Sequence, residues 1–191
     1  MVLNSVQQVR QALSVGDWQT ARKICEDSLQ NDPGDRQTKR LLAEIEHRSG
    51  NPQKASRIYL DLVERNPDSA DDWRGLALAR KAMADLPGTY AAITEFVKLN
   101  PNDSLALNTM GLCAYHMNQG DEALRCLDLA ASIEPNVPAI HRNRGLVLVG
   151  LSRHAEANLA FNRGLEIDPN DFRLWYSAPA SICGMIVRPI V

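Results

Sequence analysis

Residues 104–137 read SLALNTMGLCAYHMNQGDEALRCLDLAASIEPNV, and this stretch decides the fold of the 191-residue chain. It closes with an acidic residue, Glu134, followed by proline. Asn, Asp or Glu followed by proline recurs every 34 residues, at Pro33, Pro67, Pro101, Pro135 and Pro169. A fixed period of this length indicates a repeat array, in which one small unit stacks on copies of itself.

Each unit carries a small residue that is followed four places later by a larger one. Residues four apart share one face of a helix, where the small residue lets a neighbouring helix approach and the large one fills the gap. Upstream, Gly16 and Gly50 occupy matching break positions, and Trp73, Leu76 and Ala77 show the apolar spacing of an earlier helix. The sequence therefore predicts two helices per unit. The small residue and the larger residue four places later are, unit by unit, Ala21 and Cys25, Ala55 and Tyr59, Thr89 and Ile93, Ala123 and Leu127, and Ala157 and Phe161.

Composition narrows the classes of partner. The chain is 45% hydrophobic and 23% charged, with a net charge of -2, so it has no broad basic field for nucleic acid or an anionic membrane. The opening residues, MVLNSVQQVRQAL, contain no apolar signal region, and no stretch reaches the ~18 apolar residues of a membrane span. The four cysteines form no C-x-x-C pair, which suits a reducing compartment. We expect a cytoplasmic protein.

The repeats resemble the tetratricopeptide repeat, whose pattern is W-x2-L-G-x2-Y, then A-x3-F, then P, in 34 residues. The fifth unit, for example, supplies Gly145, Ala157, Phe161 and Pro169. The resemblance covers residues 2–169, as five units at about 2–35, 36–69, 70–103, 104–137 and 138–171. It implies an all-α fold, a right-handed α-solenoid of antiparallel helix pairs whose first helices line a concave groove.

The same resemblance assigns the groove to the second, fifth, ninth and twelfth residues of each unit. The fifth position gives a polar row that is mostly arginine, and arginine pairs carboxylates with two parallel hydrogen bonds. The ninth position adds an apolar row, and the twelfth adds Lys81 and Tyr115. The expected ligand is an extended or helical protein segment with acidic and apolar residues. The two rows are Arg40, Arg74, Asn108 and Arg142, and Leu78, Leu112 and Leu146.

Simpler interpretations of both rows stay open. Exposed arginines are common on solvated helix faces, and the leucines can pack against the next repeat. The two-carboxylate clamp of chaperone-binding relatives is disfavoured, because Arg40 is followed by Glu44 where that clamp has asparagine. An asparagine ladder at the sixth position, as in glycosyltransferase superhelices, has the single member Asn143.

Catalytic motifs are absent from the sequence. There is no G-x4-G-K-[ST], G-x-S-x-G, H-E-x-x-H or G-x-G-x-x-G, so we expect neither an enzyme nor a cofactor. Cys113 and His116 lie three apart and could share a metal with Cys126 or His141. This site is disfavoured because Cys113 falls at a buried helix position and His116 at an exposed one. His47 and His154 are expected at the surface.

The last residues, 170–191, are expected to form a partial capping helix and an apolar tail. Trp175 occupies the tryptophan position of a sixth unit, but Pro179 interrupts it and the chain ends in SICGMIVRPIV. The tail could cover the fifth unit, mediate self-association or mark a chain cut from a longer one. Two functions are therefore compatible with the sequence: an adaptor that holds a partner segment in its groove, and the docking arm of a larger enzyme such as a transferase.

Overall fold

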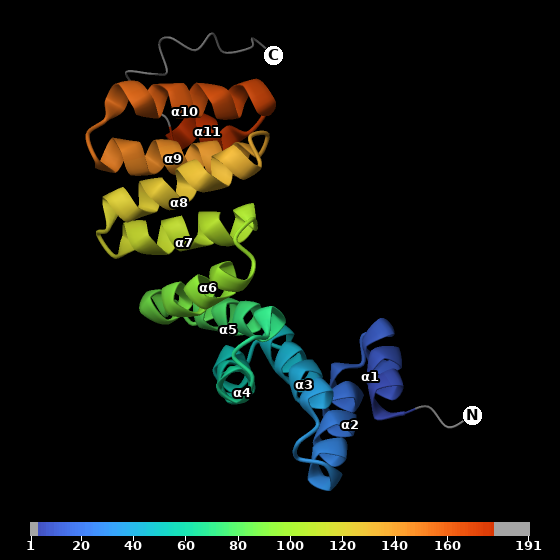
Figure 1. Ribbon diagram of the computed structural model, residues 1–191. Helices are drawn as coiled ribbons and strands as arrows, with labels where there is room; N and C mark the ends of the chain where they lie inside the picture. Colours follow the sequence, from blue (N-terminus) through green and yellow to red (C-terminus); the bar gives the residue numbers. More distant parts are fainter. Residues whose placement is uncertain (1–3, 178–191) are drawn as a thin grey trace. The chain divides into compact units, whose positions relative to one another are not determined.

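The computed structural model describes residues 4–177, and in this part of the chain every regular element is a helix (Figure 1). The prediction of two helices in every unit is confirmed by five consecutive helix pairs and one short further helix. The helices are α1 (Ser5–Ser14), α2 (Trp18–Asn31), α3 (Arg36–Arg48), α4 (Pro52–Arg65), α5 (Ala70–Ala82), α6 (Leu86–Leu99), α7 (Ser104–His116), α8 (Gly120–Ile133), α9 (Pro138–Gly150), α10 (His154–Ile167) and α11 (Phe172–Ser177).

Polar residues that precede the helices fix where several of them begin. The side chain of Asp17 accepts a hydrogen bond from the Thr20 amide, and that of Asp103 accepts one from the Ala106 amide. Such caps satisfy amides that have no partner inside the helix, and each typically stabilises by about 1 kcal/mol. The helix starts are therefore encoded locally.

The turn inside each helix pair contains one residue in the left-handed backbone conformation. Gly16 and Gly50 have φ of 76° and 82°, as expected for the glycine break positions. The equivalent positions in the later units are not glycine, yet Ala84, Asn118 and Ser152 have φ of 57°, 59° and 60°. The repeat geometry thus imposes this conformation at 34-residue spacing even where the side chain disfavours it.

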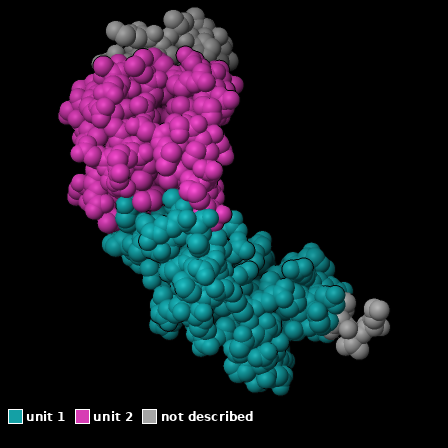
Figure 2. Space-filling view, viewed as in Figure 1, with its two compact units in different colours: residues 1–99 teal, residues 100–191 magenta. Residues whose placement is uncertain are grey.

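The chain divides into two compact units, residues 1–99 and residues 100–191 (Figure 2). Within each unit, the two helices of a pair pack together. The second helix of a pair also packs against the first helix of the next, as α2 does on α3, α4 on α5 and α8 on α9. First helices of neighbouring pairs touch as well, α1 with α3, α3 with α5 and α7 with α9. The faces of α1, α3 and α5 in one unit, and of α7 and α9 in the other, are called the first-helix faces below.

Small residues allow this close packing. Ala21, Ala55, Ala123 and Ala157 are completely buried. A Cβ added at Gly145 would lie 2.6 Å from the ring of Phe161, and one at Gly111 would lie 2.9 Å from Leu127. At these two positions the helices approach so closely that only the hydrogen atom of a glycine fits, and a large side chain of the facing helix fills the remaining space.

The short helix α11 follows the fifth pair and contacts α9 and α10. Its Leu174 is fully buried, and a Cβ at Gly164 would lie 2.9 Å from both Leu174 methyl carbons. Leu174 thus covers part of the apolar end of the fifth pair. The apolar tail, residues 179–191, which could cover the fifth unit, lies outside the described residues.

Candidate functional site

Arg40, the first arginine of the predicted polar row, lies in an ion-pair cluster between α3 and α5. Its Nε lies 2.6 Å from Asp72 Oδ1, and its Nη2 donates to Ser69 Oγ at 3.2 Å. Arg36 Nη2 also donates to Asp72, to Oδ2, at 2.6 Å. We call these four residues the α3–α5 cluster. It connects two neighbouring repeats, because two arginines of one repeat share a carboxylate of the next.

Asp72 stays ionised although its side chain is completely buried. Burial by itself raises the pKa of this carboxyl, but hydrogen bonds from Arg40, Arg36 and Ser69 outweigh it and leave the pKa below its ordinary value. A buried carboxylate with all its partners in place is strongly destabilised when one is removed. Arg40 therefore has a structural task that its place in the sequence did not reveal.

The other predicted residues of the first unit form an exposed stripe along α5. Arg74, Leu78 and Lys81 are spaced i, i+4 and i+7, so they share one helical face. Arg74 is 57% exposed and pairs with Asp71 at 3.1 Å, Leu78 is 49% exposed, and Lys81 is exposed. We call Arg74, Leu78 and Lys81 the α5 stripe.

The polar row of the second unit is engaged within the protein. Asn108 is buried, and its Oδ1 accepts a hydrogen bond from Asn143 Nδ2 at 2.8 Å, which links α7 to α9. Arg142 is only 17% exposed, and its Nη1 lies 3.4 Å from Asp171 at the start of α11. Asn143, noted from the sequence as a lone asparagine at the sixth position, thus finds its partner in the neighbouring column, at the fifth position of the preceding repeat.

The apolar residues of the second unit form the other part of the candidate surface. Leu112 and Leu146 are half-buried on α7 and α9. Tyr115 lies against the end of α9, since a Cβ at Gly150 would be 2.6 Å from its Oη. Leu105, which the sequence analysis did not single out, is 72% exposed. It occupies the second position of its unit, and that position was the signal that could have identified it.

The cysteines and histidines do not form a reactive or metal-binding group among residues 4–177. Cys113 is buried and His116 exposed, as expected. His141 Nε2 is instead 2.8 Å from the carbonyl oxygen of Pro135, and no cluster of three or more metal-ligating side chains occurs in this part of the chain. Burial raises the pKa of the Cys25 thiol to about 11, so little thiolate is present at neutral pH. His154 is exposed as expected, whereas His47 is half-buried.

Within the described residues, the helices are all too short or too polar to cross a lipid bilayer. The longest contain 14 residues, fewer than the roughly 20 that a spanning helix requires.

Comparison with known families and structures agrees with this architecture. Family models described as tetratricopeptide repeat match residues 12–86 and 109–172. The chain belongs to the tetratricopeptide-repeat family. No curated protein sequence matches it.

Solved structures share the fold at low sequence identity. MamA is 21% identical with a TM-score of 0.82, over 91% of this chain and 99% of MamA. YrrB, described as a TPR protein with an unusual peptide-binding site, is 15% identical with a TM-score of 0.83, over 91% of this chain and 89% of YrrB. A thermophilic TPR protein from Thermus thermophilus is 22% identical with a TM-score of 0.60, over 94% of this chain and 97% of the other.

These likenesses confirm the predicted fold class, an all-helical α-solenoid. Membership of the tetratricopeptide-repeat family supports a general role as a protein-interaction scaffold.

Proposed function

We propose that this protein is an adaptor that binds a segment of a partner protein on its first-helix faces. The observation that carries this proposal is the α5 stripe, where Arg74, Leu78 and Lys81 place an apolar side chain between two cations on one exposed face. The ligand that complements such a stripe carries an apolar residue between acidic ones.

The cations of the α5 stripe are free to contact a ligand. The pair between Arg74 and Asp71 is more than half exposed on both sides, and exposed pairs contribute about 0–1 kcal/mol. A ligand carboxylate can therefore replace Asp71 at little cost. Lys81 forms no ion pair with any other residue in the 4–177 range, which leaves its charge available.

The first-helix face of the second unit suits the apolar part of a ligand. Leu105, Leu112, Tyr115 and Leu146 lie on α7 and α9, and none of them is fully buried. Tyrosine in particular offers a large contact area at low entropy cost. A segment with acidic and apolar residues can thus bind to either unit.

Arg40, Asn108 and Arg142 have an indirect role in this proposal. Their polar atoms face Asp72, Asn143 and Asp171, so they hold neighbouring helices in place and thereby shape the face that the ligand meets. The direct contacts come from the members of the predicted set that are exposed or half-buried: Arg74, Leu78, Lys81, Leu112, Tyr115 and Leu146.

Three further observations agree with an adaptor. YrrB, which shares the fold, is described as having a peptide-binding site. The sequence contains none of the common catalytic motifs, and for this reason we expect a protein that binds rather than catalyses. Cys25, Cys113 and Cys126 are not disulfide-bonded, which suits the cytoplasmic location that we propose for this adaptor.

The experiment is a selection of random 16-residue peptides displayed on phage, followed by affinity measurements on the selected peptides. We expect enrichment of Asp or Glu together with Leu, Ile or Phe. In fluorescence anisotropy, Arg74→Glu with Lys81→Glu should weaken binding at least tenfold, which is about 1.4 kcal/mol.

A matched charge reversal on another face separates the effect of this surface from the effect of net charge. Lys23 and Arg57 are exposed on the second helices α2 and α4, so Lys23→Glu with Arg57→Glu changes the net charge equally on another face. This control should bind like the wild type. Equal weakening by both double variants, or selected peptides without acidic residues, would overturn the proposal.

A further inference from the structure

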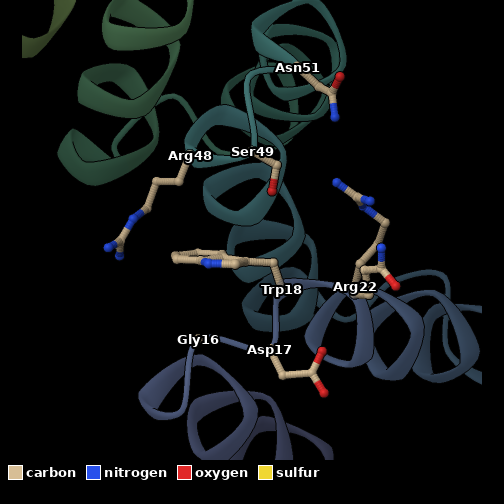
Figure 3. A pocket seen from close by; sticks show the side chains of 8 residues that line it. Gly16, Asp17, Trp18, Arg22, Arg48, Ser49 and Asn51 are labelled. Atoms are coloured by element: carbon tan, nitrogen blue, oxygen red, sulfur yellow. The ribbon is translucent and has the colours of Figure 1, made fainter.

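An open pocket of about 560 Å³ lies in the first unit, between the turn that joins α1 to α2 and the turn that joins α3 to α4 (Figure 3). Trp18 and Arg22 reach it from α2, while Arg48, Ser49 and Asn51 reach it from the end of α3 and the following turn. It lies at the turns of the first two repeats, apart from the α5 stripe, and it is independent of the function proposed above.

A buried carboxylate holds Arg22 in position at this pocket. Glu46 is 2% exposed, and its Oε1 lies 2.9 Å from Arg22 Nε while its Oε2 accepts from Arg22 Nη2 at 3.2 Å. Asn51 Nδ2 donates to Glu46 Oε2 at 2.8 Å, and Lys54 Nζ lies 3.8 Å from Oε1. Arg22 is therefore ordered before any ligand arrives, which lowers the entropy cost of binding.

The geometry leaves one edge of Arg22 unused. A guanidinium has five N–H donors, and Glu46 accepts a hydrogen bond only from Nη2; it also lies 2.9 Å from Nε, which is buried without a hydrogen-bond partner among the described residues. Figure 3 shows the guanidinium directed toward the segment that carries Ser49 and Asn51. The remaining edge, formed by Nη1 and Nη2, has the spacing that pairs with a carboxylate through two parallel hydrogen bonds.

Two cations lie beside the single buried carboxylate of Glu46 at this end of the pocket, because both Arg22 and Lys54 pair with it. The carboxylate of Asp17, which also lines the pocket, accepts a hydrogen bond from the Thr20 amide of its own helix at 3.0 Å.

An aromatic side chain supplies an apolar wall. The guanidinium of Arg48 lies 4.7 Å from the ring centroid of Trp18, and Trp18 is itself half-buried. An apolar group that accompanies the anion can therefore contact Trp18, which lines the pocket.

The repeat fold does not by itself require these residues. The four positions equivalent to Trp18 hold Pro52, Leu86, Gly120 and His154, and each of them begins the second helix of its pair without an aromatic ring of this size. The buried Glu46 also has no carboxylate equivalent in the other repeats. The fold does not need it for stability, because a buried ion pair stabilises a protein less than apolar packing does. The equivalents of Glu46 are Ala12, Arg80, Ala114 and Leu148.

From this geometry we infer a carboxylate-binding site: the Arg22 edge pairs with a carboxylate of a protein ligand, and an adjoining apolar side chain lies against Trp18. Both a chain terminus and an acidic side chain carry this group, and the test distinguishes them.

The experiment follows the indole N–H resonance of Trp18 in heteronuclear NMR spectra, assigned by its loss in Trp18→Phe. The probes are N-acetylphenylalanine, its neutral amide, and N-acetyl-Phe-Asp-amide, whose only carboxylate is a side chain. We expect saturable shifts with a charged probe and at least fivefold weaker binding of the neutral amide. Tighter binding of the first probe identifies a chain terminus as the natural ligand group, and tighter binding of the third identifies an acidic side chain.

Two variants complete the test. Arg22→Gln with Glu46→Gln removes both charges together, so no buried charge is left unpaired, and it should weaken the charged probe at least fivefold. Arg144→Gln with Asp128→Asn removes a comparable pair in the second unit and should leave binding unchanged. Equal binding of the charged and neutral probes to the wild type would overturn the inference, whatever the variants do.

Discussion

Gly145→Ala tests the packing rule from which the fold was predicted. Gly145 lies on α9 at a position where an added Cβ would be 2.6 to 2.8 Å from three ring atoms of Phe161 on α10. Ordinary van der Waals contact begins at 3.4 Å, so the ring must retreat by several tenths of an ångström. Phe161 is fully buried and has no solvent-filled space to enter.

Two effects of opposite sign decide the magnitude. Alanine is favoured over glycine inside a helix by about 1 kcal/mol. Overpacking a well-packed core costs about 1–3 kcal/mol. Because the obstacle is a rigid buried ring and three of its atoms are involved, we expect overpacking to dominate, with a net loss of about 1–2 kcal/mol.

Urea unfolding followed by circular dichroism measures this loss, and a double-mutant cycle assigns its cause. Phe161→Leu alone should cost about 1–2 kcal/mol, because it removes buried ring atoms. In the double variant the alanine methyl has room, so the combined loss should be smaller than the sum by about 1 kcal/mol.

Either of two results would refute this reasoning. A Gly145→Ala protein more stable than the wild type would mean that the ring yields freely and helix propensity decides. Additive losses in the cycle would mean that the cost of Gly145→Ala does not come from Phe161.

The remaining predictions concern the turns and the α3–α5 cluster. Gly50 and Ala84 share the left-handed backbone conformation, and a Cβ at Gly50 would meet no atom within 4 Å. Gly50→Ala should therefore destabilise the protein by about 1 kcal/mol through backbone strain alone. Ala84→Gly should stabilise it by about 0.5 kcal/mol, as measured by thermal unfolding. Opposite signs would show that the turn is not strained. Since the pKa of Asp72 is lowered in the folded protein, its ionisation stabilises the fold above its ordinary pKa, and this contribution is lost as the pH falls through the lowered value. The Asp72→Asn protein should therefore have a lower free energy of unfolding than the wild type at neutral pH. Below about pH 4 its free energy of unfolding should fall less than that of the wild type. Parallel profiles of the two proteins from pH 7 to pH 2 would contradict this.

Much of the fold was predictable because it depends on local sequence signals. Proline at a 34-residue period, small residues at matching positions and acidic helix caps each act within a few residues of where they stand. The pairing of a small residue with a large one also survived into the structure, as Gly145 against Phe161 shows. The left-handed turns at Ala84 and Ser152 could not be predicted from residue type, because the packing of the two flanking helices imposes them.

The sequence did not show how the residues of the predicted polar row are used in the fold. The fifth position of the repeat identifies hydrogen-bond donors along one column, but it does not show which acceptors the next repeat brings to them. Arg40 meets Asp72 and Arg142 meets Asp171, each about one repeat further along the chain. Carboxylates near the start of the following first helix were the sequence signal for this pairing.

The position of a side chain along its first helix therefore determines which of two tasks it can perform. The start of the following first helix supplies a carboxylate to Arg40 and to Arg142, so the fifth position is drawn into contacts between repeats. Arg74 differs because its ion pair is with Asp71 of its own helix, and both side chains of that pair are more than half exposed.

The ninth and twelfth positions lie one and two turns further along the first helix, beyond those carboxylates. Leu78 and Lys81 remain exposed there on α5, and the leucine and tyrosine at the same positions of α7 are not fully buried. Among the described residues, side chains at these positions make no ion pair with a buried charge of a neighbouring repeat, although Tyr115 packs against the end of α9. Under the proposed function, ligand selection should depend on the later turns of the first helices, while charged groups in the earlier turns hold neighbouring repeats together.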